Sequence, residues 1–281
     1  MTSQTLSAAT LASGKGHKDE NFPVASWLLK PQHRAPIMAF YRFARAADDV
    51  ADNEHASAPE RLALLGAMRA TLSGGSDAAP EGLALREVLA EYRLSPQHGL
   101  DLLTAFERDC TVNRCATWAD LIDYCRVSAM PVGRYVLDVH GEDRATWAAN
   151  DALCAALQVI NHLQDCGKDY RKLDRVYIPL DLLARAGARV EDLGGERATP
   201  GLKVAIAECA RLTQGLLQQS ARFARDIRDT RLAMEVAAIQ ALAERLTARL
   251  RTADPLSEKV HHSKAQMAWI AGRAALARAL R

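Results

Sequence analysis

The sequence predicts an all-α fold, and three observations support this prediction. Val, Ile and Thr never alternate with polar residues over a stretch long enough for a strand. Residues typical of helix N-termini recur along the chain, and each starts a predicted helix. Glycine-rich stretches separate the predicted helices. We expect one all-α domain of roughly ten helices.

Helix starts can be placed from capping residues, in chain order. Ser57 followed by Glu60 forms a capping box, with Pro59 tolerated in the first helical turn. Ser95, Thr117 and Thr199 are each predicted to be N-caps. The glycine-rich stretches 73–77 and 187–201 are predicted to end the helices that precede them.

Length and composition indicate one globular domain. The chain has 281 residues, of which 49% are hydrophobic and 25% charged. Residues 1–16 are rich in Ser, Thr and Ala without an apolar core, so we expect a flexible leader rather than a secretory signal. Residues 17–281 are expected to form the single helical domain. No apolar run is long enough to span a membrane.

Charge, cysteine and histidine content argue against several functional classes. The net charge is only +2 and no basic stripe with aromatic residues occurs, so no nucleic-acid partner is expected. The six cysteines lack CxxC spacing and are expected to be reduced thiols of a cytoplasmic protein. The eight histidines, His162 among them, lack the spacing of zinc ligands.

Two acidic clusters carry the functional signal. Asp48 and Asp52 are four residues apart near the end of one predicted helix, and Asp165 and Asp169 repeat this spacing in another. On a helix each pair lies on one face, about 6 Å apart along the axis. Carboxylates so placed suit Mg²⁺, which also takes oxygen ligands from phosphate and water. The alternative is an ordinary solvated helix face.

Neighbouring residues favour the metal site over the solvated face. Arg45 shares a face with Asp48 and Asp52, which places a cation beside the carboxylates. Gln158 and Asn161 continue the second acidic pair into a polar stripe on an otherwise apolar helix. Polar groups buried without partners are costly, so the stripe indicates a lined cavity. Two acidic pairs facing each other would clamp a diphosphate through bridging metals and promote its ionisation.

A predicted helix from Trp118 to His140 carries an interruption. Pro131 and Gly133 lie two residues apart within an apolar run, which predicts a kink and a close approach of another group. A kink made only for packing is the other interpretation. Tyr124 precedes Ser128 by one helical turn, so both side chains lie on one face of the bend.

Taken together, these segments resemble the squalene/phytoene synthase family of head-to-head trans-isoprenyl diphosphate synthases. The resemblance implies a single-domain helical bundle of the isoprenoid-synthase type with a central active-site cavity. The resemblance runs from about Asn21 to the last predicted helix. It rests on four stretches: Arg45 to Asp52, Tyr124 to Gly133, Gln158 to Asp169, and Asp169 to Pro179. No single motif is specific, but their combination is.

Within this family the motifs are most similar to the bacterial branch that makes hydroxysqualene for hopanoid synthesis. The segments 20–26, 41–49 and 128–134 carry this similarity. The implied reaction is Mg²⁺-dependent ionisation of presqualene diphosphate, followed by rearrangement and capture of water. Mg²⁺ is then the implied cofactor, and no NADPH is expected.

The resemblance also implies roles for individual residues. The implied metal ligands, also catalytic, are Asp48, Asp52, Asp165 and Asp169, and Tyr124 is a further catalytic residue. The implied substrate-binding residues are Arg45, Asp49, Tyr41, Phe22, Ser128, Gln158, Asn161, Arg171 and Arg175. Among these, Tyr124, Gln158 and Asn161 are the candidates for positioning the water.

The sequence departs from the family pattern at two positions. Ala44 precedes Arg45 where relatives often have cysteine, and Gln164 precedes Asp165 where many have arginine. The second departure removes a cation from the implied diphosphate site.

Two alternatives remain: an enzyme that condenses two prenyl diphosphates to presqualene diphosphate or phytoene, and an inactive relative that acts as an assembly factor. A third interpretation is a helical binding module with no catalytic activity. It is disfavoured because the combination of motifs would then be a coincidence.

The C-terminal segment allows two interpretations. From Lys259 to Arg281 it combines apolar residues at helical spacing with a basic fringe. It is favoured as the last helix of the bundle. It also suits peripheral contact with anionic lipid, which would place the protein at the inner face of the membrane.

Overall fold

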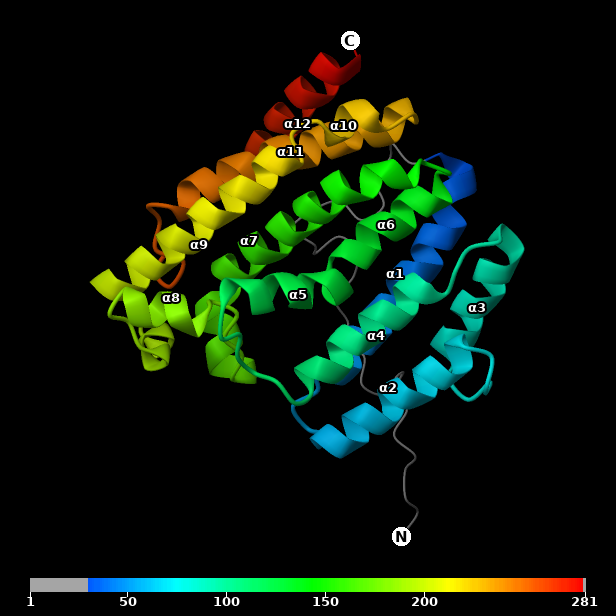
Figure 1. Cartoon of the computed structure of the whole chain (residues 1–281), viewed down its shortest axis with the longest axis horizontal. Helices are drawn as coiled ribbons and strands as arrows, with labels where there is room; N and C mark the ends of the chain where they lie inside the picture. Colours follow the sequence, from blue (N-terminus) through cyan, green and yellow to red (C-terminus); the bar gives the residue numbers. More distant parts are fainter. Residues whose placement is uncertain (1–29, 280–281) are drawn as a thin grey trace. The chain divides into compact units, whose positions relative to one another are not determined.

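The structure is helical, as the sequence predicts. This computed structural model describes residues 30–279, with side chains to residue 277, and in that range the one extended pairing is an isolated bridge between Arg114 and Val176. Twelve α-helices and two 3₁₀ turns occur among the described residues (Figure 1): α1 Pro31–Ala51, α2 Ala58–Leu72, α3 Pro80–Tyr92, α4 Gln97–Asp109, α5 Trp118–Ser128, α6 Met130–Val139, η2 Arg144–Thr146, α7 Trp147–Leu173, α8 Leu180–Arg185, η3 Val190–Gly194, α9 Pro200–Gln219, α10 Phe223–Asp226, α11 Thr230–Leu250 and α12 Lys264–Ala279.

The described helices group into two compact units. Unit 1 holds α1 to α4 together with Asp138–Gly141, and unit 2 holds α5, α6 up to Leu137, and α7 to α12. The leader predicted for residues 1–16 and the side chain of Phe22 lie outside the described residues. The extent of one domain over residues 17–281 stays a prediction.

Unit 1 is built around α1. Helix α1 packs on α3 and α4, and α2 packs on the same two helices. Phe43, Ala47 and Val50, spaced four and three residues apart, are fully buried and fix the inner face of α1. The side chains of Arg45 and Asp48 are less buried. The inner face therefore sets the rotation of the helix that carries the first acidic cluster.

Unit 2 is built around α7. This 27-residue helix contacts α5, α9, α11 and η3. Ala155, Ala156 and Ile160 are fully buried along its inner side. Small alanines let neighbouring helices approach closely, and Ile160 fills the remaining core volume. Helix α12 packs against α11, which agrees with its interpretation as the last helix of the bundle.

The predicted interruption between residues 118 and 140 is a break between two helices. Helix α5 ends at Ser128, Ala129 follows as its C-cap, and α6 starts at Met130. Gly133 lies where α6 meets α7. A Cβ at this position would lie 2.0 Å from Oδ1 of Asn150 and 2.6 Å from Sγ of Cys154. The close approach predicted for this glycine is confirmed.

Most of the predicted helix starts are confirmed. Thr117 and Thr199 cap α5 and α9, and the N–H of Ser57 donates to Glu60 over 2.8 Å in a capping box. The prediction for Ser95 is wrong by one residue, because Pro96 is the N-cap of α4. The Ser95 hydroxyl accepts from the N–H of Gln97 instead.

Cysteine chemistry and membrane topology agree with the sequence analysis. All six cysteines are free thiols, and burial raises the pKa of Cys125 and Cys154 to about 12. These thiols are therefore protonated at neutral pH. Among the described residues, no helix combines the length and apolarity that crossing a bilayer requires.

The contact at Gly133 predicts opposite effects of two glycine substitutions. Gly133→Ala should lower the free energy of unfolding by about 1–3 kcal/mol, because the new methyl group meets Asn150 and Cys154. Gly215→Ala, in α9 with no atom within 4 Å of the added Cβ, should raise it by up to about 1 kcal/mol through helix propensity. Urea unfolding of both variants tests this. Equal shifts of the same sign would contradict the packing argument.

Candidate functional site

The first acidic cluster lies at the carboxyl end of α1, in unit 1. Arg45 bridges two of its members, with 2.9 Å from Nη1 to Asp48 and 2.8 Å from Nη2 to Asp49. The side chain of Asp49 is only 7% exposed, whereas that of Asp48 is 36% exposed. Asp52 is the C-cap residue and half-buried. Asp49 therefore anchors the arginine, and Asp48 and Asp52 are the more accessible carboxylates.

The position of this cluster is electrostatically unfavourable without a cation. A helix carries partial negative charge at its carboxyl end, which repels carboxylates. The last turn of α1 nevertheless contains Asp48 and Asp49 and has no basic residue. Arg45, one turn earlier, offsets part of this charge. A divalent cation on Asp48 and Asp52 would offset more, so these residues fit the Mg²⁺ that the sequence suggests.

The second acidic cluster lies on α7, in unit 2. Gln158, Asn161, Asp165 and Asp169 follow one another at steps of three, four and four residues, and all four are half-buried. Lys168 lies 3.6 Å from Asp165, and both side chains are partly exposed. The polar stripe predicted on this helix therefore faces neither the core nor open solvent, as expected of residues that line a ligand site.

Gln164 makes a structural contact within unit 2. Its side chain is buried, and its Nε2 donates to the carbonyl oxygen of Val260. Position 164 therefore ties α7 to the segment that leads into α12. A buried amide thus supports the helix beside Asp165.

An aromatic cluster lies beside the polar stripe in unit 2. The rings of His162 and Tyr177 are stacked with centroids 3.5 Å apart and an interplanar angle of 16°. Tyr124 from α5 lies 5.5 Å from Tyr177 and 6.1 Å from His162. Gln158 Nε2 lies 3.1 Å from His162 Nε2. The structure thus brings the predicted Tyr124 and Gln158 together around a histidine.

Sequence reasoning missed His162 because it searched the histidines for zinc spacing. A different signal was present: His162 follows Gln158 by four residues and precedes Asp165 by three, so all three share one helix face. Tyr177 reaches the cluster from a loop.

His162 is held in its neutral form. Burial and the positive charge of Arg175 lower the pKa of His162 to about 3. Arg175 is itself only 6% exposed. The imidazole is therefore a hydrogen-bonding group at neutral pH and not a cation.

The remaining predicted residues fall in different environments. Arg171 is exposed, and its Nη1 donates to the carbonyl oxygens of Leu193 and Gly195, each at 3.4 Å. Arg175, in contrast, is buried beside His162, so the two arginines differ in their access to solvent. The Ser128 hydroxyl donates to the carbonyl oxygen of Tyr124, within the helix. Tyr41 is half-buried in α1.

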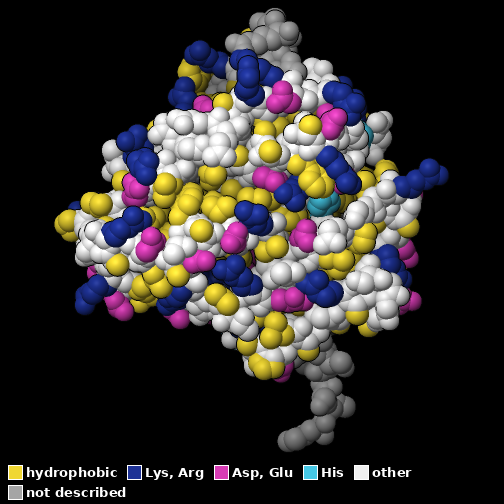
Figure 2. All heavy atoms as spheres, viewed as in Figure 1, with side chains coloured by type: hydrophobic (Ala, Val, Ile, Leu, Met, Phe, Trp, Pro, Cys, Tyr) yellow, Lys and Arg dark blue, Asp and Glu magenta, His cyan; other side chains and the backbone are white. Residues whose placement is uncertain are grey.

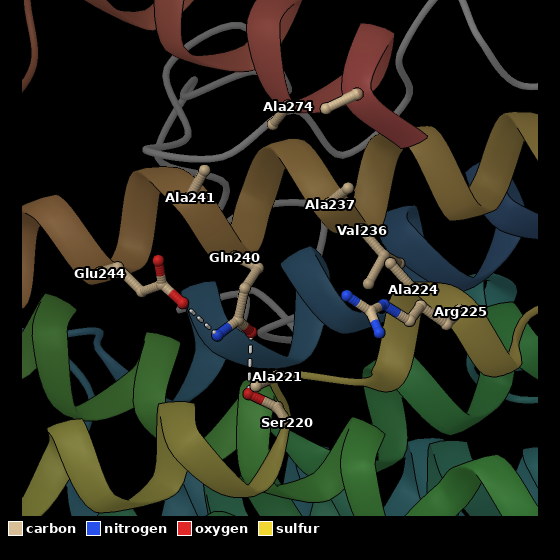
Figure 3. Close-up of a pocket in the computed structure, with 11 residues that line it drawn as sticks. Ser220, Ala221, Ala224, Arg225, Val236, Ala237, Gln240, Ala241, Glu244 and Ala274 are labelled. Atoms are coloured by element: carbon tan, nitrogen blue, oxygen red, sulfur yellow. Dashed lines mark hydrogen bonds between the residues drawn. The ribbon is translucent and has the colours of Figure 1, made fainter. Parts of the chain in front are cut away.

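A separate cavity lies between α9, α10, α11 and α12. Its volume is about 530 Å³, and alanines form much of its lining. Figure 3 shows that Gln240 accepts from Ser220 and donates to Glu244, at 2.8 and 2.9 Å. These three polar side chains of the lining therefore bond to one another. On the face shown in Figure 2, acidic and basic side chains are interspersed.

The chain is similar to known proteins over most of its length. The family model for squalene/phytoene synthase matches residues 15–266. A hydroxysqualene synthase of Zymomonas mobilis is 56% identical over 99% of this chain and 94% of its own length. One from Rhodopseudomonas palustris is 53% identical, with 91% and 87% covered. The crystal structure of squalene synthase HpnC from Alicyclobacillus acidocaldarius has a TM-score of 0.72 and 32% identity, covering 87% of this chain and 91% of that one.

The neutral state of His162 predicts a pH dependence of stability. The unfolded chain binds a proton at His162 near pH 6.5, whereas the folded protein resists it down to about pH 3. Below pH 6.5 the proton binds to the unfolded chain but not to the folded protein. The free energy of unfolding therefore falls with pH, by about 2 kcal/mol at pH 5 relative to its value above pH 6.5. Urea unfolding at pH 7.5 and pH 5 measures the loss. Between pH 7.5 and pH 5, His162→Phe should lose about 2 kcal/mol less unfolding free energy than the unmodified protein. Equal losses in the two proteins would contradict a buried, neutral His162.

Proposed function

Because the chain belongs to the squalene/phytoene synthase family, we propose that it converts presqualene diphosphate and water into hydroxysqualene and diphosphate. The observation that carries this proposal is the pair of carboxylates on each of α1 and α7, set among half-buried polar groups. The relatives named hydroxysqualene synthase, at 46–56% identity, support this branch of the family. The product belongs to the squalene and hopanoid class of isoprenoids.

The metal in this proposal is Mg²⁺, held by Asp48 and Asp52 of α1 and by Asp165 and Asp169 of α7. When bound, Mg²⁺ supplies Lewis acidity that stabilises the leaving diphosphate. Arg45 orients Asp48 and compensates the charge of Asp49, through the contacts at 2.9 and 2.8 Å. These residues suit Mg²⁺ because carboxylate oxygens are the hard ligands that it prefers. In addition, the pair on α1 lies at the negative end of its helix, which attracts a cation.

The reaction balances without a reductant. The bond between carbon and the diphosphate oxygen breaks, and its electron pair leaves with the diphosphate. The cyclopropane ring opens to an allylic cation, a water oxygen bonds to that cation, and the proton passes to the released diphosphate. No NADPH is required. The ring faces of Tyr124 and Tyr177 suit the stabilisation of such a cation.

Two alternatives are distinguished by the product. A condensing enzyme would join two prenyl diphosphates with the same carboxylates, so substrate choice decides between the branches. An inactive assembly factor would need none of the aspartates. The accessible carboxylates of both motifs favour an enzyme.

The proposal predicts the outcome of a product assay with Mg²⁺ and no NADPH. Presqualene diphosphate should give hydroxysqualene, and farnesyl diphosphate should remain unchanged, as read by mass spectrometry. Asp165→Asn should lower the rate by at least about ten- to a hundredfold, since even groups that only support metal ligands contribute that much. Glu208→Gln, which alters an exposed carboxylate paired with Arg211, should leave the rate unchanged. Consumption of farnesyl diphosphate would move the chain to the condensing branch.

We also propose peripheral contact of α12 with anionic lipid, at the inner face of the membrane. Trp269 is 53% exposed, and the guanidinium groups of Arg245 and Arg273 lie over its ring, 5.3 and 4.8 Å from the centroid. Leu276, 59% exposed, continues the same helix face. The sequence from 264 to 281 contains no acidic residue. An aromatic ring flanked by arginines suits a lipid headgroup region.

This contact is testable by flotation with vesicles of phosphatidylglycerol and phosphatidylcholine. The protein should float with them at low salt and remain behind at high salt. Arg273→Glu should weaken binding roughly tenfold or more, because each basic residue near the surface contributes about 1 kcal/mol. Arg126→Glu makes the same charge change at an exposed position of α5 and should have little effect. No flotation of the unmodified protein at low salt would exclude the contact.

A further inference from the structure

His162 contacts both the polar stripe of α7 and the tyrosines of the aromatic cluster. Its ring stacks on Tyr177 at 3.5 Å and meets the side-chain amide of Gln158 at 3.1 Å. It is 9% exposed. A ring held in this way has one fixed orientation.

The contact with Gln158 determines the direction of the hydrogen bond. The nitrogen of a glutamine side chain only donates, so Nε2 of His162 accepts and the imidazole proton resides on Nδ1. A protonated imidazole would have no lone pair for this bond. Burial and the neighbouring Arg175 keep the ring neutral and so keep the acceptor in place.

Once its nitrogen is bound to His162, the amide of Gln158 can present its oxygen in only one way. Among the residues that the structure describes, the contact to His162 is the one hydrogen bond of the Gln158 side chain. Oε1 therefore remains available to accept from a ligand or water. Gln158 is half-buried and lies on the face of α7 that carries Asp165.

We propose that His162 is a positioning residue that turns the Gln158 carbonyl oxygen toward the water that captures the cation. This inference rests on the proposed function and names the group that controls its last step. Oε1 accepts from one O–H of the water, which directs an oxygen lone pair at the cationic carbon. The carbon–oxygen bond forms, the surplus proton passes to the released diphosphate, and Gln158 is unchanged. Without this orientation, the cation loses a proton instead and gives a hydrocarbon.

Two substitutions separate the hydrogen bond from the stacking. His162→Phe keeps a flat ring against Tyr177 but removes the acceptor. His162→Gln loses the ring and retains an acceptor oxygen near the position of Nε2. The measurement is the ratio of hydroxysqualene to hydrocarbon formed from presqualene diphosphate with Mg²⁺, together with kcat, KM and the thermal midpoint.

The expected result is a changed product ratio at similar substrate consumption. His162→Phe should lower the ratio of alcohol to hydrocarbon about tenfold, the equivalent of one hydrogen bond of about 1.4 kcal/mol. His162→Gln should retain most of the alcohol. Because His162 acts through Gln158, combining His162→Phe with Gln158→Leu should change the ratio no further than Gln158→Leu alone.

Several outcomes would overturn this inference. An unchanged ratio in a folded, active His162→Phe protein would reduce His162 to a packing role. Loss of alcohol in His162→Gln but not in His162→Phe would assign the effect to stacking on Tyr177. Additive effects in the double variant would separate His162 from Gln158. If the unmodified protein made no hydroxysqualene, the proposed function would fail first and this inference with it.

Discussion

The structure of unit 2 depends on how α7 is buried. One side of this helix must pack against α9 and α11, while the stripe from Gln158 to Asp169 must remain accessible to polar ligands. Alanines at 155 and 156 and the absent side chain at Gly133 allow close packing on the apolar side. On α6, Arg134 pairs with Asp151 of α7, which adds a polar contact beside the glycine. Tight packing leaves the helix little freedom to rotate, so the carboxylates keep their direction.

The electrostatics of α1 complement this rigidity. Asp49 is buried with Arg45, and this pair holds the arginine beside Asp48. The charge at the carboxyl end of the helix is costly in the free protein and becomes favourable when a cation binds. If the proposed Mg²⁺ binds there, some folding stability would thereby be exchanged for affinity toward the metal. The burial of neutral His162 next to Arg175 likewise costs stability as the pH falls, because burial and the arginine disfavour the protonated ring.

The all-α class, the helix starts at Thr117 and Thr199 and the close approach at Gly133 could all be predicted, because each depends on local chemistry. The family could be predicted because its motifs are contiguous. Single residues with long-range partners could not. The stacking of His162 on Tyr177 and the bond from Gln164 to Val260 join positions that periodicity does not connect. The division of the helices into two units follows from contacts that no single segment contains.

The bond between Gln164 and Val260 has a consequence for protein engineering. A buried amide that loses its acceptor costs about 1–3 kcal/mol, and Gln164 directly precedes Asp165. Ending the chain before Val260 would therefore destabilise α7, the helix that carries the second acidic motif. Val260 thus supports α7 from the segment before α12, and a shortened protein made for crystallisation should retain residues 259–263.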